Sequence, residues 1–278
     1  PARPLRFTTD EGTWMSLDVS NDGQWIVFDL LGDIYKIPLA GGKATRLTSG
    51  QAFDGQPNFS PDGKTIVFVS DRSESDNLWL MDADGRHVRA LTKETDHSYV
   101  SPTWTPDGKY VVASKSNSFS GGAFNVFMYF GGGGTGLQLT GTDSAAAGGR
   151  GGGGGRGGAA VLNNFVGPAF GPDGRYMYVA ARNGGGGYNQ TSLGWQIAVY
   201  DRETGRTFIR TDAPGSAMRP EVSPDGKWLV YATREDSVTS LRIRELSSGD
   251  EHWLVHRVQR DDQESRFTRD LEPPFAFT

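Results

Sequence analysis

The sequence predicts an all-β protein, specifically a β-propeller made of four-stranded antiparallel blades. The main observation is a Pro-Asp-Gly or Asn-Asp-Gly turn that recurs five times, with 40 to 66 residues from one Asp to the next. Short alternating strands and polar turns follow each recurrence in the same order. Units of about 40 residues that each form one four-stranded sheet are typical of propeller blades, because such a sheet must stack on its neighbours to bury both faces. No segment between the turns keeps the 3.6-residue apolar period of a helix.

The second unit shows the plan of a blade. "QPNFS" (56–60) is a short strand, and "PDG" then forms a tight turn in which Pro presets φ and Gly adopts a positive φ. "KTIVFVS" (64–70), "LWLMD" (78–82) and "VRALT" (88–92) supply the other three strands. The residue pairs predicted to form the equivalent structural turns are Asp22-Gly23, Asp62-Gly63, Asp107-Gly108, Asp173-Gly174 and Asp225-Gly226.

The repeat predicts five complete blades and part of a sixth. The expected blade limits are about 14–50, 51–97, 98–141, 165–213 and 216–258. The inner strands align as "LDVS", "PNFS", "PTWT", "PAFG" and "PEVS", and "FAFT" at the end of the chain fits this series, so 274–278 is expected to begin a sixth blade that is truncated there. "PLRFTTDEGTW" aligns with "ATRLTSGQAFD", which makes about 1–9 the strand that closes a six-bladed ring and protects its edge.

Composition and charge exclude several classes of partner. The net charge of −5 gives no general attraction to nucleic acid or anionic lipid, and no apolar run of about 18 residues is present to insert in a membrane. The glycine-rich segment 141–165 contains only two arginines, Arg150 and Arg156, and no aromatic residue before Phe165. It is expected to be a flexible loop rather than an RNA-binding tract.

No catalytic or metal-binding residue is expected in this segment. "HWLVH" (252–256) resembles a zinc motif, but in a strand its two histidines would stand about 13 Å apart, too far to share one metal. Asp29 and Asp33 frame a tight link between two strands and are interpreted as turn residues. No Gly-x-Ser-x-Gly nucleophile elbow occurs in the sequence.

The longer insertions, 117–123, 141–166 and 183–194, are all expected on one face of the propeller, termed here the loop-rich face. Four cations follow the second strand of their blades and are candidate binding residues, because they would ring the channel mouth with positive charge for an anionic partner. The alternative is that they are solvated loop residues paired with neighbours such as Asp71 and Glu235. The four cations are Arg72, Lys115, Arg182 and Arg234.

The repeat "FSPDGKTIVFVSDR…NLWLMDADG…LT" (59–92) resembles the TolB-type propeller repeat, and this resemblance covers the whole chain. More narrowly, "DEGTWMSLDVSNDGQWIVFDLLGDIYKIPLAGGKATRLTSG" (10–50) is similar to the opening of the propeller that precedes the catalytic domain of bacterial metal-dependent amidohydrolases. "RDDQES…DLEPPFAFT" (260–278) resembles the same proteins near their sixth blade. The glycine-rich insertions depart from that family.

The resemblance implies that this chain is the non-catalytic portion of a larger hydrolase, which docks on a catalytic domain or restricts access to it. In that family a His-x-His motif opens the metal site; the motif is absent from this sequence, so a divalent metal, zinc, is implied only for the other domain. The implied partner is that C-terminal domain or another protein on the loop-rich face, and the implied location is periplasmic or secreted. The alternatives are a stand-alone TolB-like protein-binding module of the cell envelope and the propeller of a tricorn- or prolyl-oligopeptidase-like protease.

Overall fold

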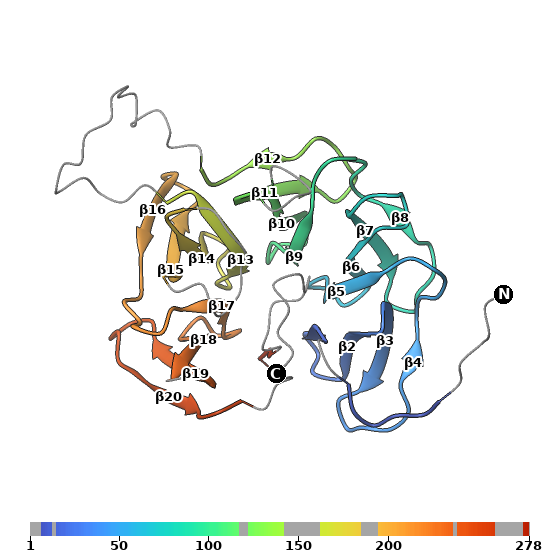
Figure 1. Cartoon of the computed structure of the whole chain (residues 1–278), viewed down its shortest axis with the longest axis horizontal. Coiled ribbons are helices and arrows are strands. Elements are labelled where there is room, and N and C mark those ends of the chain that lie inside the picture. The colour runs from blue at the N-terminus through green and yellow to red at the C-terminus, as the bar shows by residue number, and fades with distance from the viewer. Residues whose placement is uncertain are drawn as a thin grey trace.

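The computed structural model describes residues 7–12, 15–116, 122–141, 162–184, 194–235, 238–258 and 275–277. Within these residues, twenty strands form five four-stranded sheets, and every pairing between strands is antiparallel. The sheets are arranged around a central axis as blades (Figure 1). The predicted all-β propeller is therefore confirmed. The described part of the chain has no helix long and apolar enough to cross a membrane.

The strands follow chain order from the axis outward in each blade. Blade 1 consists of β1 (Leu17–Val19), β2 (Trp25–Leu30), β3 (Asp33–Pro38) and β4 (Thr45–Arg46). Blade 2 consists of β5 (Asp54–Phe59), β6 (Thr65–Ser70), β7 (Asn77–Asp82) and β8 (Arg89–Ala90). Blade 3 consists of β9 (Tyr99–Trp104), β10 (Tyr110–Ser116), β11 (Phe124–Phe130) and β12 (Leu137–Gln138). Blade 4 consists of β13 (Asn164–Phe170), β14 (Tyr176–Arg182), β15 (Gln196–Asp201) and β16 (Arg206–Ile209). Blade 5 consists of β17 (Met218–Val222), β18 (Trp228–Glu235), β19 (Val238–Glu245) and β20 (Glu251–Val255).

The Asp-Gly pairs lie in the turns between the first and second strands. In blade 2, Ser60 Oγ donates to Asp62 Oδ1 at 2.6 Å and accepts the Thr65 N–H at 3.0 Å, while Asp62 also accepts the Lys64 N–H at 3.1 Å. Gly63 completes the turn at φ 69°, where a side chain would be strained. The glycines of the other four turns adopt φ values of 65° to 71°.

Apolar residues on alternate strand positions fill the space between blades. Val27 and Ile34 of blade 1 pack with Ile66 and Phe68 of blade 2, and all four are fully buried. The same arrangement recurs between later blades, where Trp195 is the largest fully buried side chain among the described residues. Burying both faces of each sheet in this way supplies the main stabilisation of the ring.

The inner strands begin earlier than the sequence pattern predicts. Their predicted starts at the prolines are wrong for β5, β9, β13 and β17, because in each of them the strand continues upstream through a β-bulge. A proline cannot donate to a strand ladder and so suggests a strand start, but at a bulge the residue needs no partner. The residue before each proline has a positive φ, at Gln56, Ser101, Gly167 and Arg219.

The described residues form five blades. The predicted propeller is therefore found, whereas the predicted sixth blade is not formed by the described residues. Successive blades contact one another through their inner strands from β1 to β17. Residues 275–277 lie in the opening between blade 5 and blade 1 (Figure 1), where Phe275 and Phe277 pack against blade 5. Neither they nor residues 7–9 form a strand. Residues 1–6, 142–161 and 259–274, which hold most of the predicted closing strand, the glycine-rich loop and the "RDDQES" segment, lie outside the described residues.

Candidate functional site in the axial channel

The axial channel is lined by residues that occupy the same position in every blade. When the inner-strand motifs "LDVS", "PNFS", "PTWT", "PAFG" and "PEVS" are aligned, this is the second residue of each motif. Because side chains alternate across a strand, these residues share one orientation in every blade. All five line a cavity of about 470 Å³ on the side of the Asp-Gly turns. They are Asp18, Asn58, Thr103, Ala169 and Glu221.

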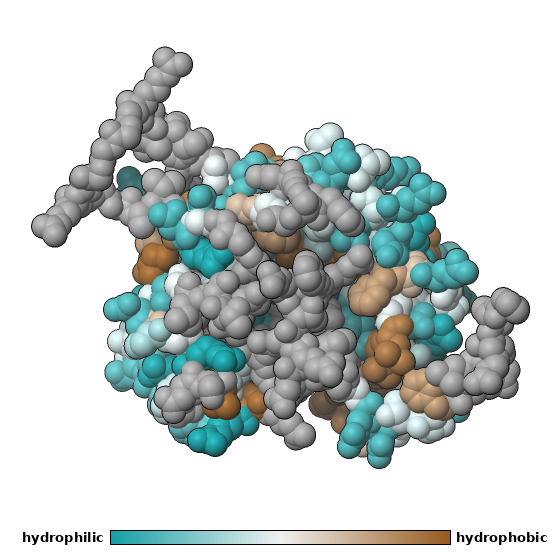
Figure 2. Space-filling model, viewed as in Figure 1, coloured by the Kyte–Doolittle hydropathy of each residue, from teal (hydrophilic) through white to brown (hydrophobic). Residues whose placement is uncertain are grey.

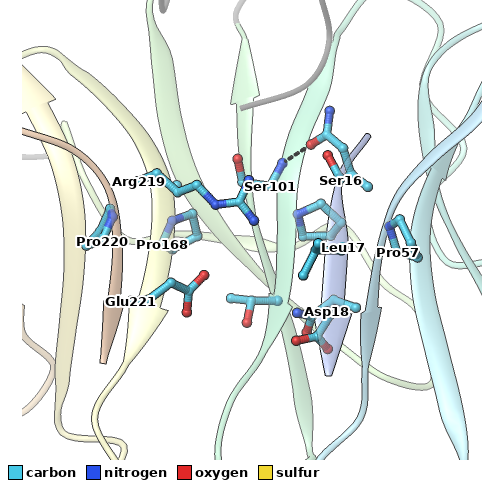
Figure 3. Close-up of a pocket in the computed structure, with 14 residues that line it drawn as sticks. Ser16, Leu17, Asp18, Pro57, Ser101, Pro168, Arg219, Pro220 and Glu221 are labelled. Atoms are coloured by element: carbon cyan, nitrogen blue, oxygen red, sulfur yellow. Dashed lines mark hydrogen bonds between the residues drawn. The ribbon is translucent and has the colours of Figure 1, made fainter. Parts of the chain in front are cut away.

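A smaller cavity of about 80 Å³ adjoins the first at the level of the bulges. Figure 3 shows Arg219 and Glu221 reaching into it from β17, with Asp18 opposite them on β1. Ser101 donates its N–H to Gln56 Oε1 at 2.5 Å, which links blades 3 and 2 across the wall. The channel is therefore narrow and charged at this level.

Two carboxyl groups in the channel titrate near neutral pH. Burial raises the pKa of Asp18 to about 6, although the Phe59 N–H, 2.8 Å from Asp18 Oδ2, and the Arg219 charge favour its ionised form. Burial likewise raises the pKa of Glu221 to about 7, and the nearby Asp18 raises it further while Arg219 opposes the shift. Both side chains keep partial exposure because they face the channel.

A third carboxyl group, that of Asp29, lies behind the channel wall. Asp29 is 4% exposed, and its two oxygens accept the N–H groups of Ser16 at 2.8 Å and Gln56 at 2.6 Å. Burial raises its pKa to about 6 despite these bonds. The turn role predicted for Asp29 is therefore wrong, because its side chain points to blade 2 and fastens the inner strands of blades 1 and 2 together.

Arg219 is the cation shared by these groups, since its charge lowers the pKa of Asp18, Asp29 and Glu221 alike. Its backbone has φ 49°, which costs about 1 kcal/mol for a residue with a side chain, and its guanidinium lies 5.4 Å from the Phe275 ring centre. With the three carboxyls ionised, one guanidinium leaves the site negative. Such a site favours hydrogen-bond donors or positive charge over anions.

Two of the predicted channel-mouth cations are paired with carboxylates. Arg72 contacts Asp54 at 2.6 Å and lies over the rings of Phe68 and Trp79. Lys115 is buried and contacts Glu94 at 2.6 Å. Their positive charge is thus matched within their own neighbourhood.

The other two cations lie in second strands, Arg182 in β14 and Arg234 in β18. The predicted position after the second strand is therefore wrong for them, as it is for Lys115 in β10, because these strands extend further than the sequence pattern predicts. Arg182 is 9% exposed with its guanidinium 4.8 Å from the Trp195 ring centre, and burial lowers its pKa. Arg234 is half-buried near the end of β18. A role for the four cations in attracting an anionic partner stays a prediction.

The histidine pair lies in blade 5 as the sequence predicts, with His252 in β20 and His256 just after it. The His252 ring packs 6.4 Å from Trp228, and the His256 ring 5.2 Å from Trp253. Among the described residues, no group of three or more His, Cys, Asp or Glu side chains is placed to hold a metal ion.

The sequence reasoning missed Asp18, Arg219 and Glu221 as site residues. A signal for two of them was available, because Asp18 and Glu221 are the only charged residues in the aligned second position of the inner strands. Arg219 carries no comparable signal, since only the bulge places the residue before Pro220 at the channel.

Radial four-stranded blades around a charged channel define this protein as a β-propeller, and its repeat and fold are TolB-like. Residues 18–147 match the family described as "Tricorn protease N-terminal beta propeller domain". The Tol-Pal system protein TolB of Francisella tularensis subsp. holarctica (strain OSU18) is 25% identical in a match that covers 45% of this chain and 41% of that protein. The chain therefore spans about two fifths of the length of this curated relative.

Two solved structures share the fold. A protein assigned as TolB in Agrobacterium tumefaciens superposes with a TM-score of 0.66 at 18% identity, covering 86% of this chain and 79% of that one. A puromycin-hydrolyzing peptidase of Mycobacterium tuberculosis superposes with a TM-score of 0.58 at 19% identity, covering 88% of this chain and 37% of that one. The predicted resemblance to TolB-type propellers is confirmed by these comparisons.

Proposed function

We propose that this propeller is the non-catalytic portion of a larger metal-dependent hydrolase of the amidohydrolase type, where it docks on the catalytic domain and controls access to it. The observation that carries the proposal is the axial channel, in which a cavity of about 80 Å³ at the level of the bulges adjoins one of about 470 Å³ on the side of the Asp-Gly turns. A volume of 80 Å³ holds only a handful of water molecules, at about 10–15 Å³ for each one. A cavity of this size holds small molecules and excludes folded ones.

The sequence similarity of residues 10–50 to amidohydrolase propellers supports the choice of hydrolase. The peptidase structure is an example in which a fold like this one accounts for 37% of a longer hydrolytic chain. Under this proposal a divalent metal, zinc, belongs to the catalytic domain, and the protein is exported to the periplasm or secreted.

The proposal includes a complete ring of six blades. On blade 1, Phe28 and Tyr35 stack at 5.7 Å on the face turned away from blade 2. On blade 5, Phe275 and Phe277 pack against the apolar cluster of β18 and β19. Two apolar faces on either side of the opening suit one further sheet, with 274–278 as its inner strand and about 1–9 as its outer strand.

A second candidate is a stand-alone TolB-like module that binds another protein through the loop-rich face, which the similarity to TolB proteins favours. A third is the propeller of a tricorn- or prolyl-oligopeptidase-like protease, which the match to the tricorn propeller family favours. The coding sequence after Thr278 distinguishes them. A His-x-His motif supports the amidohydrolase, a Ser-nucleophile elbow the protease, and an immediate stop the binding module.

Access control is tested by narrowing the channel in the full gene product. Thr103 lines both cavities, so Thr103→Trp should lower kcat/KM for a bulky amide substrate several-fold more than for a small one. Leu137→Trp, at an exposed position on β12, is the control for an added indole. Equal effects of Thr103→Trp on small and bulky substrates would contradict access control.

A further inference from the structure

The hairpin between β2 and β3 displays an apolar side chain on an unfavourable backbone. Leu30 pairs with Asp33, so the turn consists of Leu31 and Gly32, with φ values of 54° and 81°. Two positive φ values define a type I′ turn, which Asn-Gly suits and a leucine strains. Leu31 is nevertheless 77% exposed, so burial within this chain does not compensate for the strain.

A second apolar side chain is fixed beside this turn. Phe53 is 40% exposed, and its ring lies so close to Gly32 that an added Cβ would stand 3.2 Å from Phe53 Cδ2. The Asp54 N–H donates to the Gly32 carbonyl at 2.9 Å, and the Phe53 N–H donates to Asp71 Oδ1 at 2.8 Å. Leu31 and Phe53 therefore form an apolar projection on a hydrogen-bonded backbone, termed here the Leu31–Phe53 knob.

The knob belongs to the loop-rich face, because turns between second and third strands and links between blades emerge on the same side. Figure 2 shows apolar surface gathered on this side of the molecule, over the region of β2 to β5. Apolar side chains on a backbone that is already fixed before binding cost less conformational freedom in an interface, and buried apolar anchors dominate binding energy.

The border of the knob is acidic. Asp10 and Glu11 are exposed and precede Gly12, which lies against the side chain of Leu30, the residue before Leu31. The cations of the same region are matched, since Arg46 contacts Asp33 and Arg72 contacts Asp54, each at 2.6 Å. A complementary surface is therefore an apolar pocket bordered by Lys and Arg.

We propose that the Leu31–Phe53 knob docks the propeller on the hydrolase's catalytic domain, in an apolar pocket of that domain bordered by basic residues. This inference rests on the proposed function and assigns the loop-rich face of blades 1 and 2 as the interface. The strained turn keeps a leucine where asparagine would fold better because the leucine is needed for docking.

The location is tested by photo-cross-linking in the full gene product. The probe is benzoylphenylalanine, placed in separate variants at Phe53, at Leu137 on the outer edge of blade 3, and at Gln24 on the Asp-Gly-turn face. Cross-links to residues beyond 278 from position 53 alone support the proposal. Cross-links only from position 24 or 137 leave the proposed docking intact but overturn this interface. No cross-link from any position, or a gene that ends at residue 278, overturns both.

The role of Leu31 is tested by Leu31→Asn, with Leu137→Asn as the matched control at another exposed leucine. Leu31→Asn relieves the turn and should raise the propeller's Tm by about 2–4 °C. The same change should lower the cross-link yield from position 53 about tenfold, the loss typical of an interface anchor. A higher Tm with an unchanged yield would show that the turn has no docking role, and a lower Tm would show that the leucine serves the fold instead.

Discussion

The carboxyl group of Glu221 should make this propeller less stable as the pH rises, which reverses the usual acid denaturation. Its pKa is raised from 4.5 to about 7 by burial. Between these values the folded state binds more protons than the unfolded state, so the free energy of unfolding falls as pH increases. The stabilisation is fully present below about pH 4.5 and is lost by about pH 7.

The substitution Glu221→Gln removes this ionisation while keeping the shape of the side chain. The rise of the pKa from 4.5 to about 7 corresponds to about 3 kcal/mol, and solvent screening of this partly exposed side chain reduces the effect to roughly 1–3 kcal/mol. Above pH 8 the variant should therefore be more stable than the wild type by that amount, which is a rise in Tm of about 2 °C or more. Near pH 4.5 the two proteins should differ little.

Denaturant unfolding of both proteins from pH 4.5 to 8.5 measures the effect. Asp225→Asn, in the turn that follows β17, is the control, and its effect on stability should have the opposite sign. The reason is that the Ser223 hydroxyl donates to the ionised Asp225 carboxylate and lowers its pKa to about 2. That variant should lose stability at pH 8. A wild-type free energy of unfolding that rises between pH 5 and 8, or a Glu221→Gln curve parallel to the wild-type curve, would refute the assignment of a buried channel carboxyl.

Three further predictions concern single side chains. Arg219→Met should destabilise the protein by about 1–3 kcal/mol at pH 8 and by less at pH 5, because the carboxyl groups around Arg219 are protonated at low pH. Denaturant unfolding at the two pH values measures the difference. Equal losses of stability at both would contradict the role of Arg219 as a shared counter-ion. Asp29→Asn should lower the free energy of unfolding by about 1.5–3 kcal/mol near pH 8, since an amide cannot accept both N–H groups that the carboxylate accepts. The amide hydrogen of Gln56 should exchange faster in this variant. Gly171→Ser should stabilise blade 4 by about 1 kcal/mol and raise the Tm. An added Cβ meets only Asp173 Oδ1 at 3.7 Å, and a serine hydroxyl there can repeat the hydrogen bond that Ser60 donates to Asp62 in blade 2. A lower Tm would show that blade 4 cannot form that turn.

The fold follows from the sequence because its signals are local and repeated. A Pro-Asp-Gly turn such as that at Asp62 and Gly63 defines its own geometry through a side-chain bond and a positive φ. Period-two alternation then assigns each strand one face toward each neighbouring blade. Five copies of one pattern make a wrong assignment at any single copy easy to detect.

The site depends on contacts between residues far apart in the chain, which no local pattern contains. Asp29 looks like a turn residue beside Leu31 and Gly32, yet its carboxylate reaches Gln56 on the next blade, 27 residues away. Leu31 reads as an ordinary position, and only the backbone angles and exposure reveal its strain.

By itself the sequence determined the propeller, the positions of its turns and the composition of its blades, because each of these depends on neighbouring residues. Only the tertiary structure decided that Asp18, Arg219 and Glu221 meet in one channel. Asp18 and Glu221 are drawn from opposite ends of the chain, and their titration depends on burial and on one another. Desolvation and charge coupling are properties of the assembled ring, and they arise only when distant strands converge on its axis.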